Sequence, residues 1–334
     1  MDKLTEQLIR RRMHGLYLSR PCDNIAKLAH ELLGLHCWFH RNVAFSALIR
    51  GASLFGWQTA LTKTWLYRGT LHGVAFDDLP LLLALHAEDS HGWLCDYLGE
   101  NELRKIEEKV IQLMEDGVYS RAEMRQIFAD ELSFDAIDKV FSSWGGIFVN
   151  LAKQGRVAFR DMTSRDFDLI SAEPTFTRED TLPIVLRRFF ASHGPATLDD
   201  AAWFFGLQKQ KNLMRSADLS DLSRLEIGNK VYYYVDNGED MGDIPGLTLL
   251  SGFDPFLVSY LDRSAALPAE YKSRVVMKSG ICLPTIAVDG QVAGIWNIKK
   301  DAPVVEFFTK PSKSLNAAAL DLADSIRWQT SGQL

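Results

Sequence analysis

Hydrophobic positions at helical spacing mark one module between residues 179 and 240. Apolar residues recur every three or four positions from Leu182 to Phe190, and Gly194 ends the predicted helix. Thr197 is a typical N-cap for a second helix, which stops at Gly206. Two consecutive short helices are therefore predicted here.

The same module continues with a polar stretch and then with alternating residues. A third helix is expected over 208–216, followed by two strands that meet at Gly228-Asn229, a typical hairpin turn. Three helices and a hairpin are the order of a winged helix, whose third helix enters the DNA groove. A small α+β domain that binds no DNA, or a winged helix that binds protein, has the same pattern.

Two earlier stretches repeat this order with different residues. The expected elements are 4–18, 24–33, 43–50 and a strand pair around Gly69, then 102–116, 121–130, about 134–154 and a strand at 156–160. Three units of one kind in series are thus predicted.

After residue 245 the pattern changes to alternating β-branched residues. Turns at Ser279-Gly280 and Asp289-Gly290 separate the expected strands, and 317–329 is expected to form a closing helix. The predicted fold class is α+β. Winged helices are expected at 1–95, 96–178 and 179–240, and a β-rich, barrel-like domain at 245–334.

Composition narrows the functional classes. The 334 residues are 47% hydrophobic and 24% charged, with a net charge of -6, which is unusual for a dedicated DNA-binding protein but leaves room for a local basic groove. Neither a membrane-spanning run nor a secretory signal is evident, so a cytoplasmic protein without a membrane partner is expected.

Neither the cysteines nor the common catalytic motifs indicate another class of enzyme. Cys22, Cys37, Cys95 and Cys282 are far apart in the sequence, and we expect neither a disulfide nor a metal site. The GxGxxG and GxSxG motifs are missing, and no cofactor is expected.

Four stretches resemble the azinomycin-resistance DNA glycosylases, the AlkZ-like family, which shares a superfamily with YcaQ. They are WLYRGTLH (65–72), PATLDDAAWFFGL (195–207), LLSGFDPFLVSYLDRSAAL (249–267) and PTIAVDGQVAGIW (284–296). The resemblance spans nearly the whole chain and implies three winged helices before a β-rich domain. It also implies hydrolysis of the N-glycosidic bond of N7-alkylated purines, in some members within interstrand crosslinks.

The family's catalytic motif is changed in this chain. The resemblance implies a Gln-aliphatic-Gln triplet directly after Gly-Leu, but Gly34-Leu35 is followed here by His36-Cys37-Trp38. His36 can accept a proton from water, whereas the Trp38 indole offers a donor and no acceptor. His36 and Trp38 are the predicted catalytic residues. The alternatives are a histidine on a chain that has lost the chemistry and a tryptophan that packs.

The resemblance also suggests residues that contact DNA. Arg68, Thr70 and His72 are expected to alternate on one side of a strand and to face one groove. His40 and Arg41 are further candidates for phosphate contacts. A buried ion pair for Arg68 and solvated charges for His40 and Arg41 are the competing interpretations.

Asp254, Asp262 and Arg263 lie in one of the matching stretches. We expect them to form a structural Asp–Arg network between the last winged helix and the β-rich domain.

Three functions remain open from the sequence. The first is a divergent DNA glycosylase, and the second is a non-catalytic protein that binds duplex DNA. The third is a transcription regulator, which the tandem modules disfavour because regulators usually meet their half-sites as symmetric dimers. Duplex DNA is the expected partner, and no obligate protein partner is evident.

Overall fold

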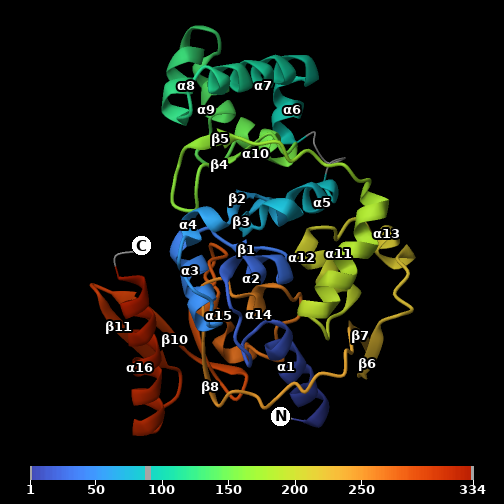
Figure 1. Ribbon diagram of the computed structural model, residues 1–334, viewed down its shortest axis with the longest axis vertical. Helices are drawn as coiled ribbons and strands as arrows, with labels where there is room; N and C mark the ends of the chain where they lie inside the picture. The colour runs from blue at the N-terminus through green and yellow to red at the C-terminus, as the bar shows by residue number, and fades with distance from the viewer. Residues whose placement is uncertain (1, 87–91, 332–334) are drawn as a thin grey trace. The chain divides into compact units, whose positions relative to one another are not determined.

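A computed structural model describes residues 2–86 and 92–331 of the chain and shows an α+β protein (Figure 1). The chain divides into two compact units. Unit 1 comprises Met1–Trp57 and Pro183–Leu334, and unit 2 comprises Gln58–Leu182. The predicted division into four modules is a finer one and stays a prediction.

Unit 1 begins with three helices and a short strand, close to the predicted positions. These elements are α1 (Lys3–Gly15), α2 (Ile25–Glu31), β1 (Leu35–His36) and α3 (His40–Ile49). Asp2 caps α1 and Asn24 caps α2, each by accepting hydrogen bonds from backbone N–H groups of the first turn. Helix α3 begins three residues earlier than expected.

The stretch from 178 to 234 contains the predicted three helices and hairpin. They are α11 (Arg178–Ser192), α12 (Leu198–Phe205), α13 (Lys211–Ser216), β6 (Ser223–Ile227) and β7 (Lys230–Tyr234). Thr197 and Asp200 form a capping box on α12, and Gly206 ends the helix with φ 76°. Ile227 pairs with Lys230 across the predicted Gly228-Asn229 turn.

The C-terminal part of unit 1 is an open antiparallel sheet rather than the barrel-like domain that we expected. Its strands lie in the order β11 (Ala302–Phe307), β10 (Gln291–Lys299), β9 (Thr285–Val288) and β8 (Leu247–Leu250). In the described chain the two outer strands, β8 and β11, do not pair with each other. Helix α16 (Lys313–Thr330) packs on this sheet and takes the place of the predicted closing helix (Figure 1).

Three short helices lie between β8 and β9 in the sequence. They are α14 (Pro255–Val258), η5 (Ala269–Tyr271) and α15 (Lys272–Val275). The core beneath the sheet includes Phe45 of α3, Trp296 of β10 and Ala323 of α16. The Trp296 indole N–H donates a hydrogen bond to the Leu250 carbonyl at 2.9 Å. The buried tryptophan is thereby satisfied.

Unit 2 is built from short helices around a small sheet. The helices are α4 (Trp57–Ala60), η1 (Tyr67–Gly69), η2 (Phe76–Asp78), α5 (Leu79–Ala84), α6 (Trp93–Leu98), α7 (Glu100–Glu115), α8 (Arg121–Ile127), η4 (Phe128–Asp130), α9 (Phe134–Val140) and α10 (Ile147–Lys153). The single helix expected over about 134–154 is therefore wrong. Gly145 and Gly146, with φ 130° and 55°, separate α9 from α10.

The strands of unit 2 pair antiparallel in the order β3 (Leu71–Val74), β2 (Thr62–Trp65), β4 (Val157–Phe159) and β5 (Phe167–Leu169). Aromatic rings fill the core between sheet and helices. Phe148 and Phe167 stack with ring centroids 3.9 Å apart, and Trp65 lies beside Phe167. The predicted strand pair around Gly69 is confirmed as β2 and β3.

Candidate active-site segment and a charged pocket

A tight turn after α2 sets the direction of the segment that carries His36. Leu33 and Gly34 have φ 59° and 106°, and the Gly34 N–H donates to the Ala29 carbonyl at 2.8 Å. Glycine adopts this conformation without strain, whereas Leu33 pays a cost that the surrounding contacts must offset. The chain therefore leaves the helix abruptly and enters β1 extended.

The next three residues alternate in exposure, as an extended segment requires. Cys37 is fully buried, whereas His36 is half-buried and 36% of Trp38 is exposed. The Trp38 backbone N–H approaches His36 Nδ1 at 3.5 Å, a long hydrogen bond in which Nδ1 accepts. The side chains of His36 and Trp38 are thus the ones available to a bound molecule.

The His36 ring stacks on Phe253, a residue far from it in the sequence. The two rings stack with centroids 4.1 Å apart and an interplanar angle of 11°. Phe253 has φ 56°, and its N–H donates to the Cys282 carbonyl at 3.2 Å. This strained residue fixes the plane of the imidazole.

A buried ion pair locks the turn that carries Phe253. Arg50 donates from Nη1 and Nη2 to the two carboxylate oxygens of Asp254, at 3.0 and 2.8 Å, and both side chains are fully buried. Asp254 also accepts hydrogen bonds from the N–H and Oγ of Ser251. The position of Phe253 therefore depends on an arginine 204 residues from Asp254 in the sequence.

His40 and Arg41 lie in the first turn of α3, directly after the segment. His40 is half-buried, and Arg41 is exposed. Both are on the same unit as His36.

The other three candidates for DNA contacts lie in unit 2, and their expected alternation along one strand is wrong. Arg68 lies in the η1 turn with φ 54°, Thr70 follows the turn, and β3 starts only at Leu71. The Thr70 hydroxyl donates to the Tyr67 carbonyl at 3.0 Å. Arg68 and Thr70 are half-buried residues of a turn, so strand geometry does not align them with His72.

His72 is a buried residue of β3, with 3% of its surface exposed. Its Nδ1 donates to the Thr70 carbonyl at 3.1 Å, which keeps the ring in place beneath the turn. Burial, reinforced by the positive charge of Arg68, lowers the pKa of His72 to about 3. The imidazole is accordingly neutral at physiological pH.

The three residues expected to form one Asp–Arg network have separate partners. Asp254 pairs with Arg50, whereas Asp262 pairs with Lys230 of the hairpin at 2.7 Å. Arg263 Nε donates to the Tyr260 carbonyl at 3.4 Å. Of the three, Asp262 joins the hairpin to the C-terminal part, and the Lys230 hydrogen bond holds its pKa below the usual value.

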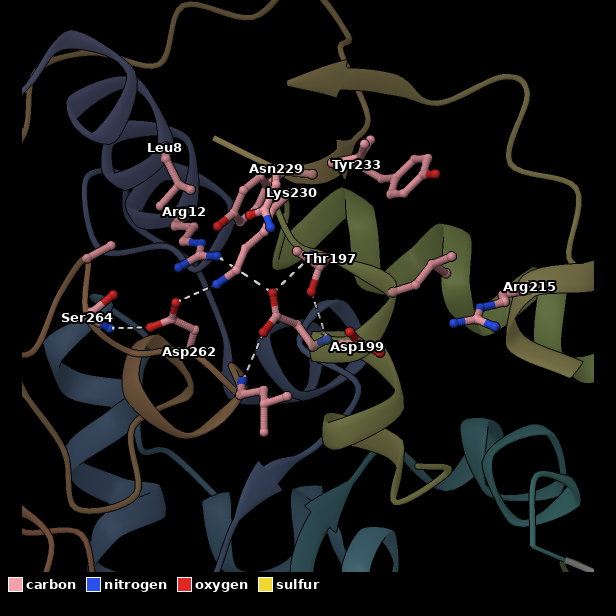
Figure 2. A pocket seen from close by; sticks show the side chains of 16 residues that line it. Leu8, Arg12, Thr197, Asp199, Arg215, Asn229, Lys230, Tyr233, Asp262 and Ser264 are labelled. Atoms are coloured by element: carbon pink, nitrogen blue, oxygen red, sulfur yellow. Dashed lines mark hydrogen bonds and ion pairs between the residues drawn. The ribbon is translucent and has the colours of Figure 1, made fainter. Parts of the chain in front are cut away.

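The Asp262–Lys230 pair borders a pocket of about 490 Å³ in unit 1. Figure 2 shows that Arg12 of α1, Lys230 of β7 and Asp262 gather on one side of it, with Thr197 at the start of α12 nearby. The pocket therefore lies where α1, α12, the hairpin and the 261–265 stretch meet.

Charges around this pocket compensate one another. Asp200 accepts backbone hydrogen bonds from Thr197 and Leu261, each at 2.9 Å. Arg12 donates from Nε to the Pro195 carbonyl at 2.9 Å, and its Nη2 lies 4.0 Å from Asp200. These contacts join distant parts of unit 1, so the pocket's polar residues serve to hold its elements together.

Other kinds of site find little support among the described residues. They contain no group of three His, Cys, Asp or Glu side chains placed to hold a metal ion. The four cysteines are free thiols. No described helix is both long and apolar enough to cross a bilayer.

The fold matches that of a solved structure. The structure is similar to that of the DNA glycosylase AlkZ from Streptomyces sahachiroi, with a TM-score of 0.78 and 22% identity over 98% of this chain and 96% of that one. The interstrand DNA cross-link repair glycosylase of the same organism is 24% identical over 273 residues, which cover 75% of this chain and 73% of that protein.

The profile of the family described as "DNA glycosylase AlkZ-like" matches residues 58–325. The chain belongs to the AlkZ-like DNA glycosylase family, as the sequence resemblance implied.

Sequence reasoning missed Phe253 and Arg50, the two residues that support the candidate segment. The sequence Asp254-Pro255 does indicate the start of a helix, because Asp is a common N-cap and Pro is favoured at the first helical position. Nothing local to the sequence indicates that His36 stacks on Phe253 or that Arg50 pairs with Asp254.

Proposed function

We propose that this protein binds duplex DNA and hydrolyses the N-glycosidic bond of N7-alkylated purines, including those in crosslinked DNA, through a divergent site at His36 and Trp38. The position of these residues carries the proposal. They follow Gly34-Leu35 as the paired glutamines do in the family that the sequence resembles, and they share the accessible side of an extended segment.

Hydrolysis of this bond needs few catalytic groups. An N7-alkylated purine is positively charged and leaves readily, so the protein must stabilise a cationic sugar and hold one water. With Nδ1 accepting from the Trp38 N–H, a neutral His36 ring carries its proton on Nε2. Nε2–H then donates to the water oxygen, as the amide N–H of a glutamine would. The sequence had suggested that His36 accepts a proton from this water, but in this arrangement His36 holds the water and does not accept its proton. The proton passes to solvent after the oxygen has attacked the cationic sugar carbon.

We further propose that 178–234 forms a winged helix, with α13 and the β6–β7 hairpin at the DNA. The order and bounds of these elements support this interpretation. Arg68, Thr70, His40 and Arg41 are proposed to contact the DNA backbone. His72, being buried, would act by supporting the turn that holds Arg68 and Thr70.

One observation favours a second function, a non-catalytic protein that binds lesion-bearing duplex DNA. Trp38 replaces a glutamine amide with an indole, which offers a donor and no acceptor. Such a protein would keep its affinity for DNA and release no base.

Base release from a duplex that contains N7-methylguanine, detected as abasic sites, separates these functions. The wild-type protein is expected to release the base, and His36→Ala to slow release about a hundredfold or more with duplex affinity unchanged. His30→Ala, an exposed histidine of α2, is the matched control and should behave as wild type. Binding by the wild type without release would establish the non-catalytic function.

A further inference from the structure

Phe55 is the most exposed of the large apolar side chains in the described chain, with 95% of its surface open to solvent. The other two large apolar residues of this turn are buried. Leu54 is 5% exposed and Trp57 is fully buried. The aromatic ring is thus presented to solvent by a segment whose other large side chains are anchored in the core.

The turn is held rigidly. The Trp57 N–H donates to the Leu54 carbonyl at 3.2 Å, and the Phe55 N–H donates to Ser53 Oγ at 3.1 Å. Gly56 at the third position has φ 64°, the conformation for which this kind of β-turn requires glycine. The contacts fix the backbone that projects Phe55.

The turn directly follows the segment that carries the candidate active site. A backbone bridge joins Asn24, at the start of α2, to Ser53. His36 and Trp38 lie between these two residues in the sequence, and Phe55 follows two residues after the bridge. Trp38 and Phe39 are further exposed aromatic residues of this segment.

A projecting apolar side chain on a rigid turn suits one task of a protein that acts on a base within a duplex. Taking a nucleotide out of the stack leaves a gap, and apolar side chains inserted between base steps fill such gaps in other DNA-binding proteins.

We propose that Phe55 is a wedge that enters the base stack of bound duplex DNA at the position of a displaced nucleotide. The inference rests on the proposed DNA binding but not on catalysis. Phe55 is a positioning residue in this proposal, because it acts on the stack rather than on the glycosidic bond.

The test uses the full-length protein and a duplex with 2-aminopurine next to a tetrahydrofuran abasic-site analogue. Binding of the wild type should raise 2-aminopurine fluorescence, because the wedge unstacks the probe. Phe55→Ala should lose this rise and bind about tenfold more weakly, the size expected for one lost aromatic–base contact. Phe55→Leu keeps an apolar wedge and should retain much of the signal.

Phe134→Ala is the matched control, since Phe134 is 79% exposed on unit 2 and should give wild-type fluorescence and affinity. A Phe55→Ala protein that melts like wild type and keeps both the rise and the affinity would overturn the wedge and leave the proposed function standing. Failure of the wild type to bind any duplex at low salt would overturn both.

Discussion

The buried Arg50–Asp254 pair should dominate the stability of the region around His36. Asp254 accepts hydrogen bonds from two nitrogens of Arg50, from the N–H and Oγ of Ser251 and from the Phe256 N–H. Among the described residues, Asp254→Ala leaves the buried Arg50 charge with hydrogen bonds to the Leu16 carbonyl and to Ser46 alone. Such a loss costs about 3–5 kcal/mol in the free energy of unfolding.

Asp262→Ala is the control, because the same change there breaks an exposed pair. Asp262 and Lys230 have side chains 48% and 45% exposed, so the expected cost is about 0–1 kcal/mol. Urea unfolding followed by tryptophan fluorescence measures both. Combining Asp254→Ala with Arg50→Met should be less destabilising than Asp254→Ala alone, because no orphan charge remains. Equal losses for Asp254→Ala and Asp262→Ala would refute the reasoning.

Two further predictions concern His36 with Trp38, and His193. Because Trp38 is partly exposed, Trp38→Gln should change the free energy of unfolding by less than about 0.5 kcal/mol. Together with His36→Gln it should restore or raise the release of N7-methylguanine, measured as abasic sites. A stable double variant that binds duplex DNA without releasing base would show that more than the glutamines is missing. Burial, with the positive charges of Arg50 and Arg12, lowers the pKa of His193 to about 3. Titration of His193 therefore leaves the free energy of unfolding unchanged above pH 6.5. As the pH drops from 6.5 towards 3, that free energy falls by about 1.4 kcal/mol per pH unit, because the unfolded chain binds a proton that the folded chain does not. In urea titrations between pH 7 and 5, His193→Phe should reduce the fall of the unfolding free energy with decreasing pH. The same fall in the variant and the wild type would contradict this assignment to His193.

Local signals predicted the elements that local contacts define. Thr197 and Asp200 mark the start of α12 and Gly206 its end, and Gly228-Asn229 fixes the hairpin register. The prediction for 134–154 went wrong because continuous apolar spacing outweighed the two glycines. A side chain at Gly146 would lie 2.0 Å from the Val140 carbonyl oxygen, so the chain turns there.

Of the residues at the candidate site, the sequence predicted His36 and Trp38 but not the two that support them. His36 and Trp38 were found because Gly34-Leu35 precedes them in a recognisable motif. Phe253 and Arg50 act through contacts between residues far apart in the sequence, which no periodicity encodes. Arg68 shows a different limit. The strand pair around Gly69 was predicted correctly, but Arg68 and Thr70 were expected to alternate along a strand although they lie in and beside the turn that joins the two strands.

Two strained residues near His36 bear on its proposed role. Leu33 and Phe253 both adopt positive φ without being glycine, and one precedes His36 in the chain while the other stacks on its ring. Each such residue costs on the order of 1–3 kcal/mol and persists only where neighbouring contacts enforce it. A surface that only bound DNA phosphates would gain nothing from a fixed imidazole plane. Holding one water against a sugar carbon does require it, because small displacements of positioning groups sharply slow such reactions. The rigid support of His36 is therefore what the proposed catalytic role requires, although both glutamines of the family motif have been replaced.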